Sequence, residues 1–287
     1  MGSIITPVVL VVLIGLVLAV ILTVAAKIFF VPVDETVARL RAELPGANCG
    51  ACGFAGCDDY ANALGADHTM STARCPVGGA EVAAKLAEVL GVEAETAEPK
   101  VAAVLCNGNC DACGQIYEWD TIKTCKAAKM FYDGMNACHY GCIGLGDCAS
   151  VCQYNAIQVC NGVAVVDRES CVACGMCAKA CPHGIIELLP KKNLVTVQCS
   201  SKAKGAATRK VCTNGCIGCM KCQKVCKFEA ITVENNLAKI DPEKCKNCGL
   251  CAKECPTGAI NNMRAKRKPA AAPAPAKEAE APAKAEA

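Results

Sequence analysis

Cysteine is the residue type in this chain whose number and spacing can do chemistry. The 287-residue sequence contains 27 cysteines and only 4% aromatic residues, which argues against one large aliphatic core. Disulfide-rich domains are usually shorter than about 80 residues and rarely repeat a tight Cys-x-x-Cys-x-x-Cys run. A small inorganic cube of iron and sulfide needs thiolates that converge from one loop, so these runs favour metal clusters over disulfides.

The C-terminal part of the chain carries two complete cluster-binding motifs. Each has the spacing Cys-x-x-Cys-x-x-Cys-x-x-x-Cys, which is typical of a bacterial-type ferredoxin with two 4Fe-4S clusters. In such modules the fourth cysteine of each motif binds the other cluster, so the spacing predicts two ligand sets. They are Cys216, Cys219, Cys222 and Cys255 for one cluster, and Cys245, Cys248, Cys251 and Cys226 for the other.

An internal repeat relates an earlier segment to this one but leaves one motif incomplete. The intact motif predicts a third ligand set, made of Cys171, Cys174, Cys177 and Cys152. In the partner motif Leu145 stands where the repeat has Cys219, so three ligands remain for the fourth cluster: Cys142, Cys148 and Cys181. The nearest substitute is Cys138, which we predict as the missing ligand. A 3Fe-4S cluster, or a cluster that draws on cysteines further upstream, is the alternative.

A fifth set of cysteines lies nearer the N-terminus, and consists of Cys49, Cys52, Cys57 and Cys75. Two cysteines three apart, a third five further on and a fourth on a distant loop can close around one cluster. The glycines between them let backbone N–H groups approach the sulfides. A structural zinc site is the alternative interpretation.

Seven cysteines fall outside these sets: Cys106, Cys110, Cys113, Cys125, Cys160, Cys199 and Cys212. The first four can hold a sixth cluster, but buried free thiols also serve as small apolar side chains. We therefore predict about five 4Fe-4S clusters. The three histidines are not placed as paired ligands of a Rieske-type centre, and the sequence has no Gly-rich dinucleotide loop and no phosphate loop.

Residues 8–26 contain no charge, and this run predicts a helix that crosses a membrane once. Lys27, Arg39 and Arg41 flank only its C-terminal end, so the positive-inside rule places the rest of the chain in the cytoplasm. A cleaved signal peptide is the alternative, but the charged segment that should precede the run is missing and no small-x-small cleavage site is convincing.

We predict an α+β fold that is divided into seven segments. They are a transmembrane anchor (1–31), a small helical membrane-proximal 4Fe-4S domain (32–90), a linker (91–100), a Cys-containing α/β segment (101–137), ferredoxin module 1 (138–190), ferredoxin module 2 (191–262) and a disordered tail (263–287). Hydrophobic periodicity predicts helices at 34–44, 57–64, 79–90 and 121–132, and a strand at 101–105.

A basic stretch runs from residue 191 to residue 228, with nine Lys or Arg side chains and no Asp or Glu. These cations can offset the negative charge of thiolate-bound clusters and tune their potentials. Alternatively, they form a docking face for an acidic electron donor such as a small soluble ferredoxin. Nucleic-acid binding is not expected, because no aromatic side chains alternate with the basic ones.

Taken in order, these segments resemble the B subunit of the Rnf complex. The resemblance covers residues 1–260 and depends on LeuProGlyAlaAsnCysGlyAlaCysGly from Leu44, TyrGlyCysIleGlyLeuGlyAspCys from Tyr140 and AsnGlyCysIleGlyCysMetLysCys from Asn214. The form with two ferredoxin modules is similar to the versions found in anaerobes. This chain departs from the pattern at Gln153, where many ferredoxin motifs have proline, and the resemblance gives no role to Cys110 and Cys113.

The resemblance implies a subunit of a membrane-bound ferredoxin:NAD oxidoreductase that couples electron flow to sodium or proton translocation. Such a subunit accepts electrons from reduced soluble ferredoxin and relays them to partner subunits, which bear flavin. The implied location is the cell inner (cytoplasmic) membrane, with a single span and the cluster domains on the cytoplasmic side. We expect electrons to enter at module 2 and leave near the membrane. A stand-alone membrane-anchored polyferredoxin, which carries electrons without a complex, is the alternative function.

Overall fold

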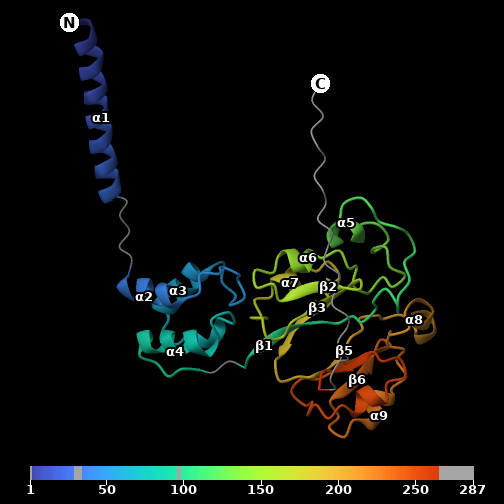
Figure 1. Cartoon of the computed structure of the whole chain (residues 1–287). Helices are drawn as coiled ribbons and strands as arrows, with labels where there is room; N and C mark the ends of the chain where they lie inside the picture. Colours follow the sequence, from blue (N-terminus) through green and yellow to red (C-terminus); the bar gives the residue numbers. More distant parts are fainter. Residues whose placement is uncertain (1, 29–33, 96–97, 265–287) are drawn as a thin grey trace, which may run out of the picture.

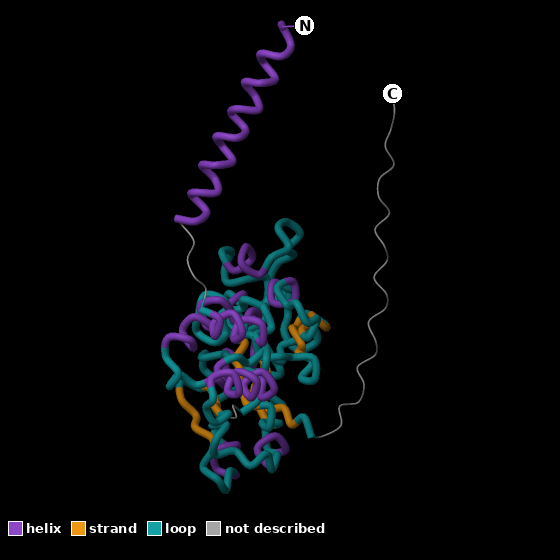
Figure 2. The backbone as a smooth tube through the Cα atoms, turned by 90° about the vertical axis from the view of Figure 1, so that its left-hand side faces the viewer, coloured by secondary structure: helices purple, strands orange, loops and turns teal. Residues whose placement is uncertain are grey.

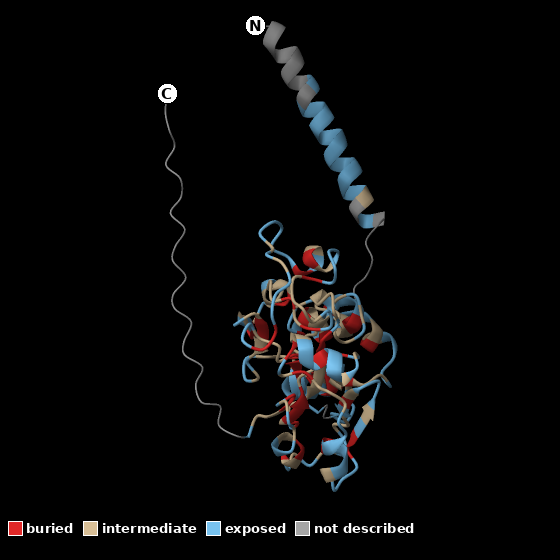
Figure 3. Cartoon of the chain, turned by 90° about the vertical axis from the view of Figure 1, so that its right-hand side faces the viewer, coloured by how far each residue is buried: buried red, intermediate tan, exposed pale blue. Residues whose placement is uncertain are grey.

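The computed structural model describes residues 2–28, 34–95 and 98–264. Much of the chain is loop, interrupted by short helices and short paired strands (Figure 2). The longest element by far is helix α1 (Gly2–Ile28), whose described side chains are exposed from Leu10 to Val24 (Figure 3). In the part of the chain that the structure describes, no helix meets the combined length and apolarity of a membrane span.

Three helices and a single 3-10 turn form the first globular domain. They are α2 (Glu35–Glu43), α3 (Cys57–Ala66), η1 (Thr72–Arg74) and α4 (Gly79–Leu90), in agreement with the helices that the sequence predicts here. Leu40, Leu64 and Leu86 are fully buried between them. The Tyr60 hydroxyl donates hydrogen bonds to the carbonyls of Ser71 and Thr72, which joins α3 to the loop before α4.

In the rest of the described chain, eight short strands form four two-stranded antiparallel sheets. β1 (Lys100–Val104) pairs with β4 (Ile186–Pro190), and β2 (Ile157–Cys160) with β3 (Val163–Val166). In the second half β5 (Val195–Val197) pairs with β8 (Ile260–Asn262), and β6 (Ile231–Glu234) with β7 (Leu237–Ile240). Each half therefore has an outer pair that joins its first and last strands, and an inner hairpin between its two cysteine motifs.

The predicted strand at 101–105 is confirmed, and its pairing shows which module it serves. β1 closes the outer strand pair of the first module although it precedes the first motif of that module by some forty residues. The helix predicted at 121–132 is shorter, because α5 spans only Cys125–Lys129. The Thr124 hydroxyl accepts a hydrogen bond from the Ala127 N–H and so fixes the start of α5.

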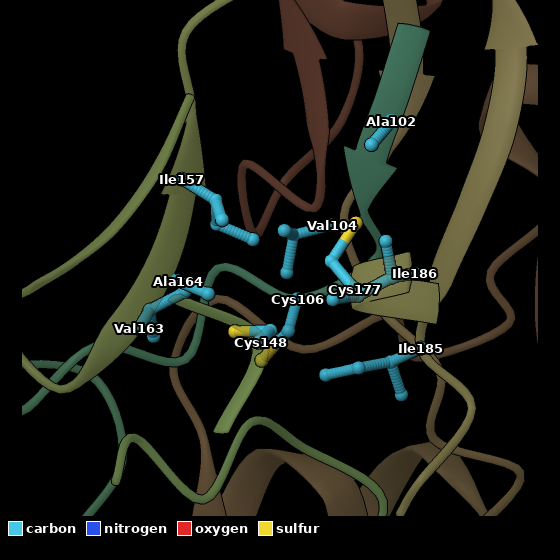
Figure 4. Packing of buried hydrophobic residues seen from close by; sticks show 10 residues of the cluster. All are labelled: Ala102, Val104, Cys106, Cys148, Ile157, Val163, Ala164, Cys177, Ile185 and Ile186. Atoms are coloured by element: carbon cyan, nitrogen blue, oxygen red, sulfur yellow. The ribbon is translucent and has the colours of Figure 1, made fainter. Parts of the chain in front are cut away.

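Four short helices carry the middle of the cysteine motifs. α6 (Asp147–Ser150) packs on α7 (Met176–Ala180) (Figure 1). In the second half α9 (Lys221–Val225) packs on α10 (Leu250–Lys253). A further helix, α8 (Gly205–Val211), precedes the motifs of the second half. Cys148 and Cys177 lie in the apolar core of the first module together with aliphatic side chains from β1 to β4 (Figure 4). Cys222 and Cys251 occupy the equivalent core of the second.

Gly144 lies in the first cysteine loop of the first module and has φ +87°. It packs against the turn of the β2–β3 hairpin, which leaves no room for a side chain. A Cβ there would lie 2.4 Å from the Gly162 carbonyl oxygen. We expect Gly144→Ala to lower the thermal unfolding midpoint of the full chain, measured by circular dichroism, with a cost of about 1–3 kcal/mol from the clash alone. Gly184→Ala is the matched control, because Gly184 also has positive φ but open space around it. Equal midpoints for the two variants would contradict this steric account.

Candidate metal centres

The four ferredoxin-type loops share one backbone conformation. In each loop the second and fourth residues after the first cysteine have positive φ, and the pairs are Gly144 and Gly146, Ala173 and Gly175, Gly218 and Met220, and Asn247 and Gly249. Three of these residues are not glycine, and a positive φ is energetically unfavourable for them. The surrounding structure therefore holds these loops in this conformation. The loop with Leu145 keeps the same turns as the intact ones, so it keeps the shape of a cluster-binding loop.

In the second module the four cysteines predicted for one cluster line a single hollow. Site 4, as we name it, consists of Cys216, Cys219, Cys222 and Cys255, which line a cavity of about 20 Å³. Site 5 is the predicted set of Cys226, Cys245, Cys248 and Cys251. Burial first, and then the thiols of Cys245 and Cys248, raise the pKa of Cys251 to about 11. Cys226 is half-buried against the same core.

In the first module the intact motif lines a hollow of its own. Site 2 consists of Cys152, Cys171, Cys174 and Cys177, which line a cavity of about 20 Å³. The Ala102 N–H of β1 lies 3.5 Å from the Cys171 Sγ, a donor to a site whose cysteines are fifty residues or more away. The outer strand pair therefore supports this site as well as the fold.

The incomplete motif has a candidate fourth cysteine that differs from the predicted one. Site 3, with a cavity volume of about 20 Å³, is lined by Cys125, Cys142, Cys148 and Cys181. Cys138, which we expected here, lines the neighbouring hollow, which Cys142 also borders. We therefore replace Cys138 by Cys125 in the candidate ligand set of site 3.

Asp147 explains how Cys125 reaches site 3. Its carboxylate accepts hydrogen bonds from the backbone N–H groups of Cys125 at 2.8 Å and Lys126 at 3.0 Å, which fastens the start of α5 to the loop. Leu145 packs against the small apolar cluster that contains Cys125, Ala128 and Ile143. The leucine that replaces a cysteine in the repeat thus forms part of the surface that holds Cys125.

Five of the cysteines left over by the sequence motifs meet at the junction of the two modules. The hollow there, which we call the joint pocket, has a cavity volume of about 20 Å³ and is lined by these five, Cys106, Cys113, Cys138, Cys199 and Cys212, and at one side by Cys142 of the first motif. Cys110 and Cys160 are exposed and line none of the hollows described here. The four cysteines of the alternative sixth set therefore do not line one hollow. Cys106 and Cys113 line the joint pocket, Cys125 lines site 3, and Cys110 is exposed.

In the first domain, site 1 is the predicted set of Cys49, Cys52, Cys57 and Cys75. The Asn48 side chain accepts a hydrogen bond from the Cys57 N–H at 2.8 Å, which ties the loop to the start of α3. The pKa of Cys75 is raised by burial first and then by the nearby Cys57 and Cys52 thiols, so these three sulfurs are neighbours. A left-handed turn at Gly50 and another at Gly53 let the loop double back between the cysteines.

Site 1 lies against site 2. Lys179 of α7 donates to the Cys49 carbonyl at 3.3 Å. Burial first, and then Cys174 of site 2 and Cys49 of site 1, raise the pKa of Tyr154. The first domain and the first module therefore meet at their cysteines.

Thiolates at these positions fit iron–sulfur clusters. Burial raises the pKa of Cys148 to about 12 and of Cys222 to about 11, so the free thiols are neutral at pH 7 and binding of a cluster releases their protons. In the described residues no three His, Cys, Asp or Glu side chains converge as the ligands of a single metal ion. Four cysteines around a hollow instead suit a cube, whose corners each take one thiolate.

Sequence reasoning left an upstream cysteine open as the alternative for this site but did not single out Cys125, and it gave no role to Asp147. Only one signal pointed to a substitution, namely Leu145 at the position of Cys219 in the repeat, and it did not say which cysteine compensates. Cys125 stands 17 residues before Cys142 and belongs to no spaced motif. Its role depends on the path of the chain between β1 and the first motif.

Three family models match segments that carry the cysteines of site 1, of site 2 and of sites 4 and 5. A 4Fe-4S dicluster domain matches residues 215–259, a 4Fe-4S binding domain matches residues 164–187, and a putative Fe-S cluster family matches residues 44–77. The chain thus contains several 4Fe-4S clusters.

Curated proteins similar to this chain match most of its length. The B subunit of the Na(+)-translocating ferredoxin:NAD(+) oxidoreductase complex of Acetobacterium woodii is 43% identical over 91% of this chain and 78% of its own length. The B subunit of the ion-translocating oxidoreductase complex of Methanosarcina acetivorans is 40% identical over 86% of this chain and 93% of its own. That of the proton-translocating ferredoxin:NAD(+) oxidoreductase complex of Clostridium ljungdahlii is 40% identical over 91% and 93%.

Replacement of Cys125 tests the fourth ligand of site 3. We expect Cys125→Ser to lose about four iron atoms per chain, or about one with a new 3Fe-4S signal in EPR. Cys160→Ser is the control, because Cys160 is exposed and lines none of the hollows described above. Iron and acid-labile sulfide on anaerobically purified protein give the measurement. An unchanged iron content and EPR spectrum in Cys125→Ser would remove Cys125 from the site.

Proposed function

Because the chain belongs to the family of B subunits of ion-translocating ferredoxin:NAD(+) oxidoreductase complexes, we propose that it is the multi-cluster electron-transfer subunit of such a complex. It accepts electrons from reduced ferredoxin and passes them to partner subunits that complete the reaction with NAD and move ions. The coupling ion belongs to those partners, since relatives of similar identity are named for sodium and for protons.

The observation that carries this proposal is that neighbouring candidate sites lie in parts of the chain that are in contact with one another. Site 1 meets site 2 at Tyr154 and Lys179. Sites 2 and 3 share the packed helices α6 and α7, and sites 4 and 5 share α9 and α10. Electron tunnelling falls steeply with distance, so closely spaced sites are what an electron relay requires. When bound, the clusters supply one-electron redox chemistry at each of these places.

The chain's own residues fix the position and the surroundings of each site. Aliphatic side chains of the strands enclose Cys148 and Cys177 in one module and Cys222 and Cys251 in the other, which keeps water from the inner side of each site. Backbone N–H groups donate to the sulfurs, as Ala102 does to Cys171. Burial and such hydrogen bonds are the means by which a protein sets the potential of a cluster.

Site 4 has the features of an entry point for electrons from ferredoxin. Cys219 is exposed at its edge, beside Met220 at 49% and Phe228 at 44% exposure. Three lysines, Lys221, Lys224 and Lys227, are exposed in the same stretch of the chain. We name this surface, made of Cys219, Met220, Phe228 and the three lysines, the docking face.

The charges of the docking face are available to a partner. Of the nine basic residues between 191 and 228, Lys191 pairs with Glu169 and Lys192 with Glu98. The other seven form no ion pair with any residue that the structure describes. An apolar centre with a cationic rim suits a small acidic protein, because opposite charges steer the encounter and the apolar contact holds it.

Reduction by ferredoxin tests both the function and the docking face. Reduced ferredoxin should bleach the visible absorbance of the full chain in stopped flow, at a rate that falls as salt rises. Lys224→Glu with Lys227→Glu should slow this step about tenfold or more at low salt and flatten its salt dependence. The same change at Lys100 and Lys123, which are exposed and lie outside the docking face, is the matched control. Equal rates for the two double variants would move the entry point elsewhere, and no reduction at all would refute the function.

We further propose that α1 anchors the chain in the cytoplasmic membrane, with the cluster domains on the cytoplasmic side. Its described side chains from Leu10 to Val24 are aliphatic, Gly, Ala or Thr, and their large apolar members stay about half exposed or more. Lys27 lies at its C-terminal end, before the globular part. Apolar side chains around a whole helix suit a lipid environment, and a cation at one end favours the cytoplasmic side for that end.

The anchor is tested by fractionation. The full chain should stay with membranes after washing at high salt and alkaline carbonate, whereas a chain that lacks residues 2–28 should appear in the soluble fraction with its iron retained. Release of the full chain by carbonate alone would contradict an integral anchor. Retained iron in the shortened chain shows that the loss of attachment does not come from misfolding.

A further inference from the structure

We propose that the joint pocket is a further 4Fe-4S site, held by Cys106, Cys138, Cys199 and Cys212, two cysteines from each half of the chain. The inference rests on the proposed function and extends it, because this site lies between module 1 and module 2. The ferredoxin motifs, sites 1 to 5, use none of these four cysteines.

The two halves contribute to the joint pocket in the same way. The Cys106 Sγ accepts hydrogen bonds from the Gly108 N–H at 3.4 Å and the Cys142 N–H at 3.3 Å. In the second half the Cys199 Sγ accepts from the Ser201 N–H at 3.5 Å and the Cys216 N–H at 3.2 Å. In each half one donor is the N–H group two residues after the accepting cysteine. The other donor is the N–H group of the first cysteine of the ferredoxin motif. This equivalence pairs Cys106 with Cys199.

The second ligand from each half follows the same equivalence. Cys138 precedes the first motif cysteine of its module by four residues, and Cys212 does so in the other module. A Cβ added at Gly141 would lie 3.5 Å from the Cys106 Sγ and 3.6 Å from the Cys138 Sγ. Both sulfurs therefore lie close to Gly141. A Cβ at Gly108 would lie 3.4 Å from the Cys212 Sγ and 3.6 Å from the Cys106 Sγ, which brings the second half to the same place.

Of the two other cysteines that line the joint pocket, Cys142 is already a candidate ligand of site 3, and Cys113 has no counterpart in the second half. It is bridged to Cys212 through the backbone, and the hydrogen bond between the two thiols lowers the pKa of Cys113 to about 6. Its thiol also lies 3.7 Å from the Gly114 carbonyl oxygen. A cube takes four thiolates, and the repeat supplies four without it.

The dimensions and the burial of the joint pocket match those of the motif sites. Its cavity volume of about 20 Å³ equals those of site 3, site 4 and site 2. Cys106 and Cys212 are buried, and Cys138 and Cys199 half-buried. Two further contacts close it, Asn214 Nδ2 to the Asn107 carbonyl at 2.9 Å and Ser200 Oγ to the Leu105 carbonyl at 2.8 Å.

The joint pocket joins two groups of sites that are otherwise separate. The Cys142 N–H that donates to Cys106 belongs to a candidate ligand of site 3, and the Cys216 N–H that donates to Cys199 belongs to one of site 4. One peptide group therefore connects the joint pocket to each module. A cluster here would place site 3 and site 4 next to a common neighbour, so that the docking face and site 1 become the two ends of one series.

Metal content tests the proposal on the full anaerobically purified chain. Six clusters correspond to about 24 iron and 24 sulfide per chain, and five to about 20 of each. The double variant Cys106→Ala with Cys199→Ala should lose about four iron and four sulfide, and its dithionite-reduced EPR spectrum should lose the intensity of one cluster. The remaining iron, about 20 atoms, reports that sites 1 to 5 have folded.

Cys113→Ala is the matched control and should keep all of the roughly 24 iron atoms. A wild-type value near 20 that the double variant leaves unchanged would overturn the proposal while sites 1 to 5, and with them the proposed function, stand. A loss in Cys113→Ala with none in Cys138→Ala would overturn the choice of the four ligands. Absence of iron and sulfide from the wild type would instead refute the proposed function itself.

Discussion

Burial of cysteine sulfur inside small apolar cores is the constraint on which this structure depends. Each ferredoxin-type module buries one cysteine from each of its two short helices among the aliphatic side chains of its strands, as Cys148 and Cys177 show (Figure 4). The strands have three to five residues, and two-stranded pairs of this size are not stable alone. The metal site and the hydrophobic core are therefore one unit, and cluster binding contributes directly to folding.

The same dependence explains how a module tolerates the loss of a motif cysteine. At Leu145 the loop keeps the two left-handed turns of the intact loops, so the hollow persists. The carboxylate of Asp147, next to the buried Cys148, accepts hydrogen bonds from the N–H groups at the start of α5. These bonds hold Cys125 at that hollow. The longer connection between β1 and the first motif provides the chain length for this replacement, whereas the second module has its own cysteine and a shorter connection that contains α8.

Charge and burial differ between the two ends of the protein in a way that fits an electron relay. The second module presents exposed lysines around an exposed cysteine, while the first module meets the helical domain through Tyr154, Lys179 and the cysteines of sites 1 and 2. One end is thus open to a transient charged partner and the other is enclosed within the chain. Transient partners are recruited by exposed charge, and fixed neighbours are held by packing.

The sequence alone determined the intact cysteine motifs, the helices of the first domain and the strand at β1, because each depends on spacing within a few residues. It also indicated, through Leu145, that one motif was incomplete. Only the tertiary structure decided that Cys125 lines site 3 and that Cys138 lines the joint pocket, although Cys138 is the nearer to Cys142 in the chain. A fourth ligand from a separate segment is selected by how the loops pack, and no local spacing records that packing.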